Sequence, residues 1–313
     1  MRYVARRLMH SLLLLAGVSV LSFVFSELAP GDYYSELQAE GRVSAATLSA
    51  LRSQNGLDRP LPLRYAIWLR SVAHGEFGYS LAYQGPVGPL LAQRIPGTLL
   101  LTCLSTGLAW LLALPIGVWS AANRGYQYDT ILKVSLSILL SIPELLLAII
   151  LLAIAVQTGW LPAGGMHSPG GGSLIDLLRH LAIPVTVLTL GLLPVLIRHV
   201  RSAVSEAMGS AFALAAAAHG IPRRRLLLRH VLPVALNPLI SLLGLSLGSL
   251  LSASLLVEVL VGWPGLGPLF LEAIFARDFA VVLGVVMVST SFLIAGNLVA
   301  DLLLYRADPR IRV

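Results

Sequence analysis

Six stretches of this 313-residue chain are long enough and apolar enough to cross a lipid bilayer. A membrane-spanning helix needs about 20 mostly apolar residues. Charged residues make up 12% of the chain, whereas a soluble domain carries about 25%. We therefore expect an all-α polytopic membrane protein with six transmembrane helices, which excludes most soluble enzymes, disordered chains and disulfide scaffolds. The stretches cover residues 8–28, 97–121, 130–156, 180–200, 235–261 and 280–304.

The basic residues predict the orientation of these helices. Cytoplasmic segments of membrane proteins are enriched in Lys and Arg. If the N-terminus is cytoplasmic, 14 of the 22 Lys and Arg lie in inner segments. Six of the remaining eight fall in one long outer loop, at 29–96, and such loops cross the membrane largely regardless of charge. We therefore expect both termini to be cytoplasmic, and the net charge of +7 to reflect topology rather than a nucleic-acid-binding face.

The spans and loops suggest three parts. Residues 1–94 would hold the first transmembrane helix and the long extracytoplasmic loop, with short helices near 45–54 and 63–73. Residues 95–305 would form a core of five transmembrane helices, and 306–313 a cytoplasmic tail. The first stretch could also be a signal peptide, but no small-x-small cleavage site follows Phe25, so an uncleaved span is preferred.

The inner loop between the fourth and fifth spans, at about 201–233, has an unusual pattern. An alanine-rich segment, 210–218, predicts a short helix, and Gly220 is placed to end it in the left-handed conformation. A second short helix carrying arginines would then lead back to the membrane. Small alanines allow a partner to approach closely, so this elbow is typical of a docking element. The alternative is a basic loop that contacts anionic lipid headgroups.

The spacing within this loop resembles the EAA loop of ABC-importer permeases. Three residues separate Ala215-Ala216 from Gly220, and eleven residues separate Gly220 from Leu232-Pro233. Leu214 stands where the motif has an acidic residue, a departure shared by the peptide and nickel branch. The resemblance implies a coupling helix that docks into an ATPase subunit. The residues expected to form this coupling loop are Ala215, Ala216, Ala218, Gly220, Arg223, Arg224, Arg225, Leu232 and Pro233.

Further short segments, in the same order along nearly the whole chain, resemble the B-type permease of dipeptide, oligopeptide and nickel ABC importers. Each segment is weak alone, and their order makes the resemblance specific. They are APGD at 29–32, GLDRPL at 56–61, GEFGYS at 75–80, GWLPAGG at 159–165, VE at 257–258 followed by WPGLG at 263–267 and RD at 277–278, and DPRIR at 308–312.

This resemblance implies a type I ABC importer permease fold in the bacterial cytoplasmic (inner) membrane. The chain would form half of a translocation pathway for peptides, with a second permease, usually a different C-type paralogue, as the other half. Two cytoplasmic ATPases would bind and hydrolyse ATP with Mg²⁺, and an extracytoplasmic binding protein would deliver the substrate. The chain itself would be non-catalytic and bind no cofactor. Nickel or another small solute is the alternative substrate.

Motifs for other chemistry are missing. The sequence contains no G-x-x-x-x-G-K-[ST] nucleotide-binding loop, no G-x-S-x-G, and no His/Cys cluster with zinc spacing. We therefore expect no catalytic and no metal site. A secondary transporter, the distant alternative, should show repeated halves with coupling ionisable residues, and no clear inverted repeat is found. An intramembrane enzyme or a channel are further rivals.

Two acidic residues within the predicted spans are candidates for the pathway. Glu144 follows Pro143 near the middle of the third span, and Glu258 lies near the outer end of the fifth. A carboxylate inside the membrane is costly and usually faces a cavity or a partner. Glu144 could meet the positive end of a peptide or a cation, or make a polar contact to a neighbouring helix. Glu258 could act in a gate or in an inter-subunit contact, or hold the Trp263 turn. The full set of pathway and gate candidates is Ser141, Pro143, Glu144, Glu258, Trp263, Pro264 and Gly265.

Overall fold

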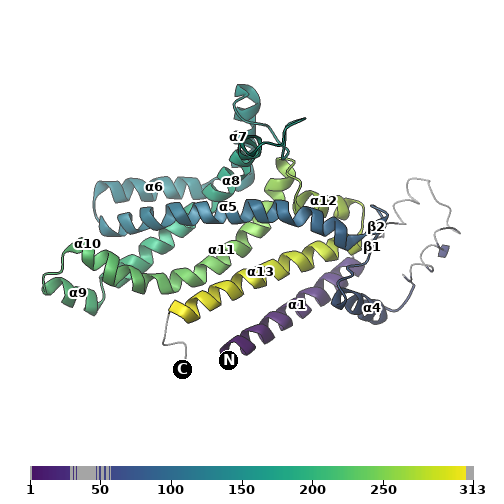
Figure 1. Cartoon of the computed structure of the whole chain (residues 1–313), viewed down its shortest axis with the longest axis horizontal. Coiled ribbons are helices and arrows are strands. Elements are labelled where there is room, and N and C mark those ends of the chain that lie inside the picture. Colours follow the sequence, from purple (N-terminus) through teal and green to yellow (C-terminus); the bar gives the residue numbers. More distant parts are fainter. Residues whose placement is uncertain are drawn as a thin grey trace. The chain divides into compact units, whose positions relative to one another are not determined.

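A computed structural model describes residues 2–28 and 58–307, together with single positions at 31, 33, 47, 49, 50, 53 and 56. The described chain is almost entirely helical (Figure 1). Its packing divides it into two compact units. The first unit comprises residues 1–98 and 264–294, and the second comprises 99–263 and 295–313. The helices α5 (Val87–Ala122) and α13 (Phe279–Ala307) each belong partly to both units.

The first unit contains α1 (Arg2–Leu28) and α4 (Leu61–Ala73), a two-stranded hairpin and α12 (Leu266–Phe275). Aromatic contacts join α1 to α4, because the Phe23 ring lies 5.4 Å from that of Tyr65 and 5.9 Å from that of Trp68. The hairpin pairs β1 (Tyr79–Ser80) with β2 (Gly85–Pro86) in antiparallel fashion. It leads directly into α5.

The second unit is built around α8 (Leu174–Met208). This helix packs against α6 (Gln127–Ser141), α7 (Glu144–Thr158) and α11 (Leu232–Leu260). Ser173 caps α8 by accepting a hydrogen bond from the backbone N–H of Asp176, as expected for a serine at this position. Two buried apolar clusters run along α8, one near each end.

Short elements between α8 and α11 also belong to this unit. They are α9 (Ala211–Ala218), α10 (Arg223–Leu226) and a single π-helical turn, η1 (Leu227–Val231). Figure 1 shows α9 and α10 at the end of the unit where α5 turns into α6.

Five of the predicted spans are continuous helices that are apolar and long enough to cross a bilayer. They correspond to α1, α5, α8, α11 and α13. Both α5, with 36 residues, and α8, with 35, are longer than predicted. At about 1.5 Å per residue each exceeds 50 Å, while the hydrocarbon core is about 30 Å thick. These two helices therefore extend beyond the membrane interior.

The third span, predicted as one transmembrane segment over 130–156, is not a single straight helix. It is broken into α6 and α7, which meet at an angle of 90°. Pro143 has no N–H to donate to the preceding turn, and it restricts Ile142 to the extended conformation seen there, with φ −87° and ψ 118°. Pro184 and Pro194 lie within α8 without ending it. A proline alone therefore does not end a helix in this chain, and at Pro143 the break coincides with the extended conformation of Ile142.

The other local predictions have mixed outcomes. The helix predicted near 63–73 is confirmed as α4. The one near 45–54 falls largely outside the described residues, as do most of the APGD segment at 29–32, part of the segment at 56–61 and the tail segment at 308–312. The predicted division at residues 94/95 and 305/306 follows membrane topology and stays a prediction.

Candidate functional site

The loop after α8 forms the elbow that its sequence predicts. In this article the elbow means residues 210–226, from the residue before α9 to the end of α10. Gly220 has φ +78°, a left-handed conformation that residues with a Cβ rarely adopt. Its N–H donates to the Ala217 carbonyl, and the next N–H, of Ile221, donates to the Ala216 carbonyl. The chain thus reverses at Gly220 and enters α10 through Pro222.

The surface of the elbow is largely exposed. Ala213 is buried, whereas Ala215 and Ala218 are exposed and Ala216 is half-buried. Two larger apolar side chains on the same helix, Phe212 and Leu214, expose 42% and 62% of their surface. An exposed apolar surface on a polar-rimmed segment is typical of an interaction site. The arginines Arg223, Arg224 and Arg225 and the later Pro233 are also exposed, and Leu232 is half-buried at the start of α11.

A buried carboxylate fixes the base of the elbow. Asp129, at the start of α6, is fully buried. It accepts a hydrogen bond from the Ser120 hydroxyl at 2.6 Å and two from the Arg201 guanidinium at 3.0 and 2.9 Å. The Lys133 ammonium lies 2.7 Å away. These contacts join α5, α6 and the last turns of α8 directly before the elbow.

A second contact joins the elbow to the same place. The Arg223 guanidinium donates a hydrogen bond to the carbonyl of Ala122, the last residue of α5. That carbonyl has no partner within its own helix, because the last four carbonyls of a helix are unpaired, and a cation there also complements the helix dipole. Two arginines therefore hold the region where α5 leads into α6. Arg201 lies on α8 before the elbow, and Arg223 lies in the elbow at the start of α10.

The sequence prediction missed Asp129 and Arg201. Asp129 and Lys133 are four residues apart, a spacing that places an ion pair on one helix face, and this was the available signal. It did not identify Arg201, which comes from α8, 72 residues away in the chain.

Glu144 is the first residue of α7, directly after the break in the third span. Its side chain is half-buried and lies against Gly191 of α8. A Cβ placed on Gly191 would come within 2.7 Å of the Glu144 Cδ. The nearby candidate Ser141 is exposed and bonds back to the Ser137 carbonyl, and Pro143 is the residue that precedes α7. These three candidates therefore cluster at the break.

The candidates near the end of α11 take part in a compact turn. Glu258 and Trp263 are both fully buried, and the Trp263 N–H donates to the Glu258 carbonyl at 2.8 Å. The glycine-rich loop after α7 reaches the same turn, because the Gly165 N–H donates to the Val261 carbonyl at 2.9 Å. A Cβ on Gly164 would meet that carbonyl oxygen at 2.7 Å. Backbone hydrogen bonds therefore hold this turn, and the role of the Glu258 side chain stays a prediction.

Pro264 and Gly265 belong to the first unit, where they precede α12. The Leu266 N–H at the start of α12 donates to the Thr98 hydroxyl at 2.8 Å. Thr98 lies on α5, so a side chain distant in sequence supplies the cap that Gly265 cannot provide. Pro264 and Gly265 therefore lead into a fixed helix start.

The RD segment at 277–278 joins separate elements of the first unit. Asp278 is buried, and one of its carboxylate oxygens accepts from the Ser80 hydroxyl at 2.6 Å and from the Ala82 N–H at 3.0 Å. Next to it the Tyr83 hydroxyl donates to Glu272. Partial burial and this hydrogen bond to a carboxylate raise the pKa of Tyr83 to about 12. Asp278 thereby ties the hairpin to the start of α13.

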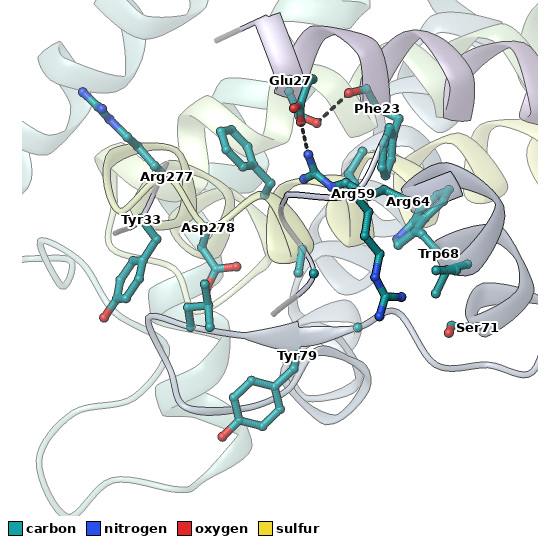
Figure 2. Close-up of a pocket in the computed structure, with 18 of the residues that line it drawn as sticks. Phe23, Glu27, Tyr33, Arg59, Arg64, Trp68, Ser71, Tyr79, Arg277 and Asp278 are labelled. Carbon is teal, nitrogen blue, oxygen red and sulfur yellow. Dashed lines mark hydrogen bonds and ion pairs between the residues drawn. The ribbon is translucent and has the colours of Figure 1, made fainter. Parts of the chain in front are cut away.

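A cavity of about 620 Å³ also lies in the first unit (Figure 2). Its wall includes Phe23, Trp68, Tyr79 and the Arg64–Glu27 ion pair, whose nitrogen and oxygen are 2.6 Å apart. Among the described residues, no group of three or more His, Cys, Asp or Glu side chains could hold a metal ion.

Comparison with known proteins identifies the family. Residues 113–313 match the family described as binding-protein-dependent transport system inner membrane component, and residues 1–102 match its N-terminal family. The chain belongs to this family. Its helices and elbow are therefore those of a multi-pass transport component.

Relatives match over the whole length of the chain. The oligopeptide transport system permease protein AppB of Bacillus subtilis (strain 168) is 35% identical over 99% of this chain and 98% of its own. OppB of Mycobacterium tuberculosis (strain ATCC 25618 / H37Rv) is 32% identical, and the dipeptide permease DppB of Escherichia coli (strain K12) is 29% identical; each match covers 100% of this chain and 99% of the relative. The expected resemblance to B-type peptide permeases is confirmed.

A solved structure supports the fold. The inward-facing MetNI methionine ABC transporter is similar with a TM-score of 0.55 and 22% identity, over 70% of this chain and 96% of that one. This likeness concerns the fold alone. It confirms the expected ABC importer permease fold for that part of the chain.

Proposed function

We propose that this chain is the permease subunit of an ATP-driven ABC importer for peptides and forms half of its translocation pathway. The observation that carries the proposal is the exposed elbow at 210–226 in a chain related along its full length to AppB, OppB and DppB. The names of these relatives favour dipeptides or oligopeptides as substrates. Nickel or another small solute is the second candidate.

The elbow is the docking element for an ATPase in this proposal. Its exposed alanines, Ala215 and Ala218, allow close approach, and Phe212 and Leu214 offer apolar surface. Arg224 and Arg225 are exposed and can reach acidic groups of a partner. Motion of a docked ATPase would reach the spans through the α5–α6 turn, since Arg223 ties the elbow to the end of α5 and Arg201 ties α8 to the start of α6. A switch of this kind needs a partner that binds the two states differently.

The remaining partners follow from the family. A second permease, expected to be a different C-type paralogue, completes the pathway, two ATPases carry ATP and Mg²⁺, and an extracytoplasmic binding protein delivers the substrate. The chain itself binds no cofactor and performs no catalysis. It lies in the bacterial inner membrane with both termini in the cytoplasm, an orientation supported by the 14 of 22 Lys and Arg on the inner side.

Co-purification tests this proposal. The tagged chain is expressed with its neighbouring genes and isolated in detergent. We expect two ATPase subunits and a second permease to be retained, and ATP hydrolysis to increase when the loaded binding protein is added. A chain that is isolated without any ATPase, yet transports solute in vesicles, would instead be a secondary transporter or a channel.

A further inference from the structure

Glu144 differs from Asp129 and Asp176, two other acidic side chains of the second unit. Asp129 is surrounded by three donors, and Asp176 accepts from the Ser168 hydroxyl and N–H. In the part of the chain that the structure describes, the Glu144 carboxylate makes neither a hydrogen bond nor an ion pair with another side chain. Its burial is only partial. One side of this carboxylate is thus available to a group outside the described residues.

Gly191 places Glu144 beside the middle of the span predicted over 180–200. It is the central residue of α8, with 17 helical residues on either side. At 1.5 Å per residue this is about 25 Å from each end of the helix. The Glu144 Cγ and Cδ lie 2.8 and 2.7 Å from the position of a Cβ on Gly191. A real Cβ atom at residue 191 could not approach the Glu144 side chain this closely. The carboxylate therefore occupies space that is free because residue 191 is a glycine.

The helix break explains how an anion can be held at this depth. The 90° turn at Pro143 makes Glu144 the first residue of α7. The first N–H groups of a helix carry partial positive charge and favour an anion. A carboxylate within a membrane span otherwise costs about 3 kcal/mol, and such residues mark ion or substrate pathways. Discontinuous helices are also where transporters bind charged solutes near the midplane.

We infer that the Glu144 carboxylate binds the positively charged group of the transported solute near the middle of the membrane. Gly191 leaves the space in which this carboxylate lies. This deepens the proposed function and rests on it. A peptide carries an ammonium group at neutral pH, since its α-amino pKa is about 8. A divalent cation such as Ni²⁺ has the same charge complementarity. The described residues hold no cluster of metal ligands around Glu144, which favours the ammonium group.

Uptake by the reconstituted complex tests this role. Proteoliposomes contain the assembled transporter and its binding protein, and separate assays measure uptake of labelled dialanine and of Ni²⁺. Because a hydrogen bond to a charged group contributes about 1.5–3 kcal/mol, Glu144→Gln should reduce dialanine uptake by about tenfold or more. Glu144→Asp should retain most of it. Loss of Ni²⁺ uptake instead would identify a metal cation as the occupant.

Two controls separate this role from a structural one. Gly191→Ala should displace the flexible carboxylate and lower uptake without lowering the unfolding midpoint, because alanine favours a helix by about 1 kcal/mol over glycine. Gly107→Ala, on a helix position where a Cβ meets nothing within 4 Å, should transport like the wild type. An assembled Glu144→Gln complex with wild-type uptake would overturn the inference. A wild-type complex that takes up neither solute would instead refute the proposed function.

A chemical measurement does not depend on any variant. Dicyclohexylcarbodiimide modifies carboxyl groups in apolar surroundings, and peptide mapping by mass spectrometry reports the fraction of Glu144 modified. We expect dialanine, delivered by the binding protein to the ATP-energised complex, to lower this fraction at least twofold. Equal modification with and without dialanine would contradict occupation of the site by solute.

Discussion

Asp129→Asn perturbs the contacts that hold the elbow at its membrane end. The substitution keeps the shape of the side chain and removes its charge. In the wild type, Ser120, Lys133 and Arg201 all contact this fully buried carboxylate. The asparagine oxygen can still accept a hydrogen bond from Ser120. Its NH₂ group, however, would face the Arg201 and Lys133 donors that contact Oδ2 in the wild type. Arg201 is then left with one hydrogen bond in place of two.

The expected loss of unfolding free energy follows from the solvent exposure of the Lys133 and Arg201 side chains. The Lys133 side chain is 48% exposed, so its ion pair contributes about 0–1 kcal/mol. The Arg201 side chain is 23% exposed and forms two hydrogen bonds to the carboxylate. Removing one partner of a buried pair costs about 3–5 kcal/mol, and we take the lower end because Arg201 remains partly solvated. Asp129→Asn should therefore lower the free energy of unfolding by about 3 kcal/mol.

SDS-induced unfolding of the purified protein, followed by tryptophan fluorescence, measures this loss. Lys133→Gln is the matched control and should cost less than about 1 kcal/mol. A double-mutant cycle of Asp129→Asn with Arg201→Gln should give a coupling energy of about 2 kcal/mol, because contacting residues are not additive. If Asp129→Asn lies within 1 kcal/mol of the wild type and the cycle shows no coupling, the reasoning about this cluster is refuted.

Three further perturbations test other parts of the account. Gly117→Ala should destabilise the protein by about 1–3 kcal/mol, because a Cβ there meets the branched Val200 side chain at 2.6 Å; an unfolding free energy equal to the wild type would contradict this close packing of α5 on α8. Gly220→Val should abolish transport while all spans insert, since valine is strained at φ +78°; normal substrate-stimulated ATP hydrolysis would argue against the coupling role. Tyr83 should reach half of its phenolate absorbance only at about pH 12, measured as the difference between the wild type and Tyr83→Phe. Because its folded pKa lies above the unfolded value of 10.0, stability should fall between these pH values as the phenol ionises, and Tyr83→Phe should weaken this fall.

Most of the fold was predictable because each span is a long apolar run, and such a run indicates a membrane-spanning helix. The elbow was equally readable, since Gly220 and Pro222 act on the backbone within a few residues. Such backbone preferences depend on the residue type and can therefore be predicted from the sequence. The broken third span was less clear, because Pro143 breaks a helix while Pro184 and Pro194 do not. The difference depends on packing around each proline.

The candidate site was predictable only in part, because its contacts join distant segments. Glu144 was identified as a charge within a span, but Gly191, against which its side chain packs, lies 47 residues further along the chain. Arg201 was counted as one of several basic residues on the inner side, and its bond to Asp129 required the packing of α8 against α6. Thr98 likewise caps α12 from 168 residues away. No period or spacing in a single sequence reports such pairs.

ATP-dependent uptake of a labelled dipeptide is the measurement that bears most directly on the central claim. Proteoliposomes would contain this chain, its partner permease and the ATPases, with ATP inside or outside and with the binding protein present. The account predicts uptake that requires ATP on the ATPase side, the binding protein and this chain, and that stops when a non-hydrolysable nucleotide replaces ATP. Uptake that continues without ATP and follows an imposed ion gradient would contradict it.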